Sequence, residues 1–118
     1  MGLDFRGSRA HWSYSGFHSF RCRLAQEIGM NLDAMPGFTY FSGVMSDARW
    51  EDYDDPILPL LNHSDCDGEL APEVCQVVAP RLREIVTGWP DDYDRRQAFM
   101  LADTMERCGQ EGRPLVFC

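Results

Sequence analysis

Lysine is absent from the 118-residue sequence, and all eleven basic side chains are arginines. The chain therefore has no side-chain amine for Schiff-base chemistry or for lysine-based proton transfer. Arginine can still bind carboxylates and phosphates through paired hydrogen bonds. Nineteen acidic residues outnumber the arginines and give a net charge of −8, so we expect no general binding to nucleic acid.

Cysteine pairs and long apolar runs are missing too. The five cysteines include no Cys-x-x-Cys motif, so we predict free thiols rather than a disulfide framework or a zinc ribbon. A zinc site that uses His63, Cys66 and Cys75 is an alternative. No apolar run reaches the roughly 20 residues that span a bilayer, and the polar start of the chain does not look like a signal peptide. These absences predict a cytoplasmic protein that does not contact membranes.

The sequence does contain enough apolar material for one core. Apolar residues make up 44% of the chain and aromatic residues 12%, which disfavours global disorder. A length of 118 residues is typical of one domain. We therefore predict a single domain over residues 1–118.

Three stretches have the apolar spacing of amphipathic helices. They cover approximately residues 15–28, 72–88 and 91–107. Ser15 can cap the first of these helices. Pro80 lies inside the second and predicts a kink or a break there. Gly109 and Gly112 should end the third helix.

Short strands are predicted around these helices. They cover residues 2–6, 38–41 and 114–118. Pro56 and Pro59 disfavour a regular helix or a central strand between residues 51 and 70. The predicted fold is a small α+β domain with about three helices packed on a few short strands. Leu3 and Phe5 could pair the N-terminal strand with the C-terminal one.

The acidic residues are concentrated in one part of the chain. Residues 47–73 hold nine acids against one arginine, Arg49, and so carry the whole net charge. Residues 47–55 are interpreted as a solvated or partner-facing acidic surface. Residues 62–69 instead read as a spaced polar turn before the second predicted helix, and they are the first place to look for a bound ion.

The turn at 62–69 carries potential metal ligands at alternate positions. In an extended segment His63, Asp65 and Asp67 would point the same way, and Glu69 continues the alternation. Imidazole and carboxylate groups together suit a divalent cation such as Ca²⁺, Mn²⁺ or Zn²⁺. The alternative is an ordinary turn in which the aspartates accept hydrogen bonds from backbone amides.

Two known metal motifs resemble this turn. The segment from Asp65 to Leu70 is similar to part of an EF-hand calcium loop, although Val74 stands where that loop needs a glutamate. The order His63-x-Asp65-x-Asp67-Gly resembles an element of the DHH phosphoesterases. That resemblance implies manganese-dependent cleavage of phosphodiesters, although the chain has no Asp-His-His motif to supply further ligands.

A second group of potential binding residues lies before and within the first predicted helix. These residues are Arg9, His11, Trp12, Tyr14 and His18. An arginine beside a helix N-terminus can hold an anion, and aromatic rings can stack on a base. The group predicts a pocket for a phosphorylated or nucleotide-like ligand, next to the turn at 62–69. In the alternative interpretation the aromatic residues of this group belong to the core.

Several segments together resemble a set of small uncharacterised proteins of actinobacteria and their phages. The clearest are His11-Trp-Ser-Tyr-Ser-Gly-Phe17 and Leu60-Leu-Asn-His-Ser-Asp-Cys-Asp-Gly-Glu-Leu70, and the resemblance spans nearly the full chain. No activity is assigned to that set. The resemblance therefore implies an accessory or mobile-element role without naming a reaction.

The first functional hypothesis is a small, acidic, non-enzymatic binding protein. It would bind or sequester a phosphorylated or nucleotide-like ligand, or block a host defence protein. One alternative is a metal-dependent phosphoesterase with His63, Asp65 and Asp67 as ligands. The other is a domain whose turn at 62–69 holds a structural Ca²⁺ or Zn²⁺ ion. The sequence contains no nucleophile elbow, Walker loop or dinucleotide fingerprint that would indicate a specific reaction.

Overall fold

The computed structural model describes residues 2–39 and 47–118 of the chain. Its α-helices are α1 (Tyr14–Glu27), α3 (Leu58–Leu61), α4 (Pro72–Thr87) and α5 (Tyr93–Glu111). Two short 3-10 helices are η1 (Leu32–Ala34) and η2 (Trp50–Asp52). The strands are β1 (Leu3–Asp4), β2 (His11–Trp12), β3 (Glu69–Leu70) and β4 (Leu115–Val116). The predicted α+β class is confirmed, with helices as the larger part.

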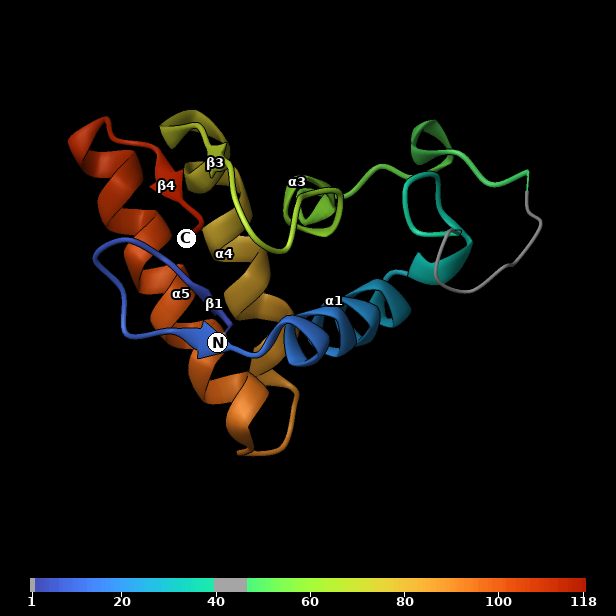
Figure 1. Ribbon diagram of the computed structural model, residues 1–118, viewed down its shortest axis with the longest axis horizontal. Coiled ribbons are helices and arrows are strands. Elements are labelled where there is room, and N and C mark those ends of the chain that lie inside the picture. Colours follow the sequence, from blue (N-terminus) through green and yellow to red (C-terminus); the bar gives the residue numbers. More distant parts are fainter. Residues whose placement is uncertain (1, 40–46) are drawn as a thin grey trace.

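Helices α4 and α5 lie side by side and form one half of the core (Figure 1). Leu82 and Leu101 are fully buried on their facing sides. Gly109 lies inside α5, where a Cβ would overlap the Gln76 side chain of α4, and Gln76 Nε2 donates to the Gly109 carbonyl over 2.9 Å. The prediction that Gly109 helps to end the helix was therefore wrong. The helix ends at Gly112, whose φ of +67° favours glycine.

Two predictions about proline also need correction. Helix α4 continues through Pro80, which lies on its exposed side, so of the predicted kink or break the break does not occur. The ring removes one N–H from the helix, but the buried contacts of the opposite face hold the turn in place. Helix α3 forms although Pro59 is one of its residues, because Pro59 occupies the first turn, where its missing N–H has no helical partner.

Helix α1 forms the other half of the core. Its N-cap is Ser13 rather than Ser15, and the Ser13 hydroxyl accepts from the Gly16 amide over 3.0 Å. Phe20, on its buried face, stacks on Trp12 of β2 with ring centroids 4.5 Å apart. From there α1 runs away from the α4–α5 pair toward η1 (Figure 1).

The strands form two small antiparallel sheets. Strand β1 pairs with β2, and β3 pairs with β4. The predicted link between the N- and C-terminal segments is present as a single bridge between Phe5 and Phe117, flanked by a 2.8 Å bond from the Cys118 amide to the Asp4 carbonyl. Each terminal strand therefore has its main partner elsewhere in the chain. The bridge brings the two ends of the chain together beside α4 and α5.

Three more predictions concern the cysteines, the strand at 38–41 and membrane-spanning helices. All five cysteines are free, as predicted. The strand predicted at 38–41 is absent at Phe38 and Thr39, and its other two residues lie outside the described ranges. Over residues 2–39 and 47–118, no helix combines the length and apolar character that crossing a bilayer requires.

Candidate functional site

A cavity of about 640 Å³ opens beside the first half of α1, and we call it the α1 cavity. Helix α1 contributes Tyr14, His18 and Arg21 to its wall, Phe38 contributes an aromatic ring, and residues 62–65 form the opposite side. Segments far apart in sequence thus meet here. Of the binding residues predicted at 9–18, Tyr14 and His18 line this cavity together with residues 62–65, whereas Arg9, His11 and Trp12 do not.

Arg21 is the most unusual residue of the α1 cavity. Its side chain leaves α1 on the buried face, and the residue is only 2% exposed. Its Nη1 donates to the carbonyls of Leu61 and His63 over 3.3 and 2.5 Å. The guanidinium carbon lies 4.7 Å from the centre of the Phe17 ring and 5.1 Å from that of Phe38. Carbonyl dipoles and ring faces therefore hold this cation in place.

The Arg21 guanidinium is incompletely satisfied. Its Nε is buried and has no hydrogen-bond partner among the described residues. No carboxylate of the described residues lies within ion-pair distance of it, although Asp65 is close enough to act through space. Burial lowers the pKa of Arg21, and the Asp65 charge opposes that shift. An arginine remains charged when it is buried, and buried charges in proteins are generally paired with an opposite charge.

His63 is fixed at the opposite side of the α1 cavity. Its ring stacks on Phe117 with centroids 3.9 Å apart. Its Nδ1 lies 2.9 Å from the Ser64 carbonyl and its Nε2 lies 3.1 Å from the Glu69 carbonyl. Because both ring nitrogens face carbonyl oxygens, a metal ion could reach either nitrogen only after one of these contacts broke.

The predicted metal ligands at 62–69 are not brought together. Of the described residues, His63, Asp65, Asp67 and Glu69 do not place their ligand atoms close enough to hold one ion. Asp67 accepts a 3.0 Å hydrogen bond from the Ser64 hydroxyl instead. That hydroxyl also accepts the Cys66 amide over 3.2 Å, so the segment has the hydrogen bonding of a turn. The alternative zinc set of His63, Cys66 and Cys75 is likewise not assembled.

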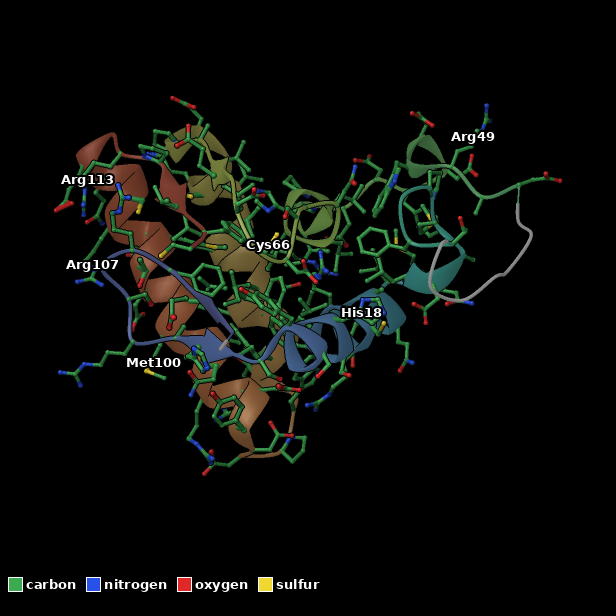
Figure 2. The ribbon with its side chains drawn as sticks, in the orientation of Figure 1. His18, Arg49, Cys66, Met100, Arg107 and Arg113 are labelled. Carbon is green, nitrogen blue, oxygen red and sulfur yellow. The ribbon has the colours of Figure 1, made fainter. Side chains whose placement is uncertain are left out.

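The predicted binding group at residues 9–18 divides among four places, of which the α1 cavity, with Tyr14 and His18, is one. Trp12 is 1% exposed, and its Nε1 donates to Asp94 over 3.0 Å, so its ring belongs to the core. His11 is at the surface, with Nδ1 2.9 Å from the Asp4 carboxylate. Arg9 lines a second cavity, of about 620 Å³, on the outer side of α5. Met100 and Arg107 of that cavity lie well apart from His18 in Figure 2.

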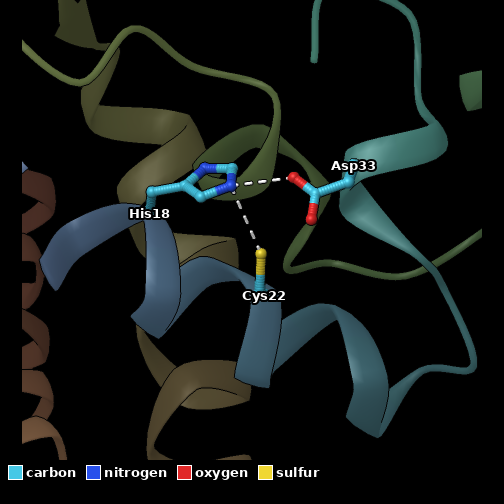
Figure 3. Close-up of side chains that lie close together, drawn as sticks. All are labelled: His18, Cys22 and Asp33. Atoms are coloured by element: carbon cyan, nitrogen blue, oxygen red, sulfur yellow. Dashed lines mark hydrogen bonds and ion pairs between the residues drawn. The ribbon is translucent and has the colours of Figure 1, made fainter. Parts of the chain in front are cut away.

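One cluster of potential ligands was not predicted from the sequence. His18 Nε2 lies 2.8 Å from Asp33 Oδ1 and 3.6 Å from Cys22 Sγ (Figure 3). Burial raises the pKa of the Cys22 thiol, and the nearby Asp33 carboxylate adds to that shift. The spacing of His18 and Cys22, four residues apart on a predicted helix, was a usable signal. Asp33 lies beyond the end of that helix and gave none.

Comparisons with known proteins identify no relative. No protein-family model matches the chain, and neither a curated protein nor a solved structure matches it.

Proposed function

We propose that this protein binds a small phosphorylated ligand in the α1 cavity and does so without a chemical step. The observation that carries the proposal is Arg21, a buried cation at the cavity wall with no carboxylate in ion-pair contact among the described residues. Burial of an uncompensated charge costs several kcal/mol, roughly, so such groups are kept where they meet a partner.

Other arginines of the chain have the carboxylate partners that Arg21 lacks. Exposed and half-exposed arginines pair with carboxylates at several places, for example Arg23 with Asp94 over 2.7 Å and Arg81 with Asp55 over 2.9 Å. The acidic chain thus has carboxylates to spare, yet the deeply buried Arg21 touches none of those described. A phosphoryl group would supply the missing negative charge, and it accepts paired hydrogen bonds from a guanidinium.

The rest of the cavity favours a nucleotide-like ligand over inorganic phosphate. The volume of about 640 Å³ lies in the range of small-molecule sites. Tyr14, which is 38% exposed, offers a ring on which a base could stack, and Asp65 offers a carboxylate for a hydroxyl or amino group. The same carboxylate repels additional phosphates. The preferred class is therefore a ligand with one phosphoryl group and an aromatic or sugar part.

Thermal unfolding with a ligand panel tests this proposal. The panel contains inorganic phosphate, nucleosides, nucleoside monophosphates and nucleoside triphosphates. A monophosphate at about 100 times its Kd should stabilise the protein by about 2.7 kcal/mol. Arg21→Met should abolish this shift because it removes the cation and keeps a similar volume.

Arg95→Met is the matched control. Arg95 also lies over a ring, 4.9 Å from that of Phe99, and donates to the Val86 carbonyl over 3.1 Å, but it is not part of the α1 cavity. Its replacement should leave the ligand shift intact. Equal shifts from nucleosides and monophosphates, or an unchanged shift in Arg21→Met, would contradict the proposal.

A further inference from the structure

We propose that His18, Cys22 and Asp33 form a three-ligand zinc site at the margin of the α1 cavity. Imidazole, thiolate and carboxylate are the side-chain groups that bind zinc in proteins, and a thiolate favours zinc over calcium or magnesium. Three protein ligands leave one position open. The inference goes beyond ligand binding at Arg21 and does not depend on it.

The backbone holds the three side chains in position without an ion. His18 and Cys22 are one turn apart on α1, so their side chains share one face of the helix. The chain then turns back, with the Met30 amide bonded to the Ala25 carbonyl over 2.9 Å. The Asn31 side chain caps η1 by accepting from the Asp33 amide over 3.2 Å. Asp33 therefore faces α1 from a fixed turn.

The distances are close to those that zinc requires. With ordinary zinc bond lengths and tetrahedral angles, a nitrogen and a sulfur ligand lie about 3.6 Å apart, and a nitrogen and an oxygen ligand about 3.4 Å apart. His18 Nε2 and Cys22 Sγ are 3.6 Å apart, and His18 Nε2 and Asp33 Oδ1 are 2.8 Å apart. All three ligand atoms lie within 4.8 Å of one another. An opening of the His18–Asp33 contact by a fraction of an ångström would admit the ion.

A histidine–aspartate hydrogen bond alone explains this cluster less completely. With a proton on Nε2, His18 can donate to Asp33 but cannot accept the Cys22 thiol, and without that proton it can accept the thiol but cannot donate to Asp33. A zinc ion takes the place of that proton and binds all three groups at once. The pair His11–Asp4, at 2.9 Å, has the same hydrogen-bond chemistry at the surface without belonging to any such three-ligand group among the described residues.

The proton balance of zinc binding is defined. The neutral Cys22 thiol releases its proton to solvent as the Zn–S bond forms, and any proton on His18 Nε2 is released as the Zn–N bond forms. Asp33 binds as the carboxylate. Three protein ligands would leave the fourth coordination position to water, and of the three only His18 also lines the α1 cavity.

Metal titration of the reduced, chelator-treated full chain tests the site. Co²⁺ should bind at one ion per chain and give the near-ultraviolet absorption of a cobalt–thiolate bond, and Zn²⁺ should displace it. Cys22→Ser should remove this absorption, and Asp33→Asn should weaken zinc binding by at least about 10-fold to 100-fold. Far-ultraviolet circular dichroism of each variant checks that it folds.

Two matched variants serve as controls. Cys66→Ser removes an exposed thiol, and His11→Gln breaks a comparable histidine–aspartate pair, so both should bind cobalt as the parent does. An absent thiolate absorption in the folded parent, or one that persists in Cys22→Ser, would overturn the zinc site. Phosphate-ligand shifts measured with a chelator present report on Arg21 separately, so failure of one proposal is distinguishable from failure of the other.

Discussion

The α4–α5 pair and the α1 cavity treat buried polar groups differently. Gln97 on α5 is 8% exposed, and its side-chain oxygen accepts the His11 amide over 2.9 Å. Thr104 is 4% exposed and donates to the Met100 carbonyl over 3.0 Å. Arg21, equally buried beside the cavity, keeps an unpartnered Nε. Gln97 and Thr104 are satisfied within the chain, and the incomplete satisfaction of Arg21 is the reason for proposing a binding site there.

The largest expected change in stability is in the α4–α5 pair. Leu82→Ala in α4 deletes a fully buried side chain and should lower the free energy of unfolding by about 2–5 kcal/mol. Val77→Ala, at a position of the same helix that is 54% exposed, should cost less than about 0.5 kcal/mol. Urea unfolding measures both. Similar losses at the two positions would mean that α4 is not packed as described.

A smaller change in stability is expected at the ion pair that joins α4 to the segment before α3. Arg81 of α4 holds Asp55 through two hydrogen bonds of 3.0 and 2.9 Å. Although partial burial alone would raise it, the bonds from Arg81 and from the Ile57 amide hold the pKa of Asp55 below its usual value. Asp55→Asn should therefore cost about 1–2 kcal/mol at pH 7.

This contribution depends on pH with a defined sign. Because the pKa of Asp55 is lower in the folded chain than in the unfolded chain, its stabilisation is full above the unfolded value, about pH 4, and declines as the pH falls through the folded value. Urea unfolding between pH 2 and 7, spanning roughly that window, should show a shallower acid loss in Asp55→Asn. The control Asp52→Asn alters an exposed pair with Arg49, at 3.6 Å, and should leave the acid loss unchanged.

The smallest effect on stability is expected at Arg21 itself. Arg21→Met loses the bonds to two carbonyls but also removes the desolvation cost of a buried charge. These changes oppose one another, so unfolding without ligand should shift by less than about 1 kcal/mol in either direction. A loss as large as that of Leu82→Ala would show that Arg21 serves the core, and the contrast between the two regions would then fail.

Much of the fold could be predicted because periodic apolar residues mark buried helix faces. The three long helices and their stripes follow from this pattern. The helix boundaries could not be predicted in this way. Gly109 has the sequence pattern of a helix end, but in the structure it lies in close contact with Gln76. Such contacts depend on which helices become neighbours, and local sequence does not contain that information.

The site could be predicted only in part. Tyr14 and His18, predicted as ligand-binding residues, line one cavity with His63 and Asp65, which were predicted as metal ligands. Trp12, from the predicted ligand-binding group, lies in the core. Arg21 could have been found, since it lies four residues after Phe17 and three before Leu24 on the buried stripe of α1. An arginine on an apolar stripe has either a buried partner or a ligand. Asp33 could not have been found in the same way, because only the turn after α1 in the folded chain brings it close to His18 and Cys22.

The stack of His63 on Phe117 links the cavity wall to the C-terminal strand. The Phe117 amide donates to the Gly68 carbonyl over 2.9 Å, just after the segment that faces Arg21. A ligand that holds residues 62–65 must then also suppress local opening of β3 and β4. Amide hydrogen exchange at Phe117, a residue outside the cavity, should slow as the cavity fills. Hydrogen exchange near the C-terminus would therefore report whether the α1 cavity is occupied.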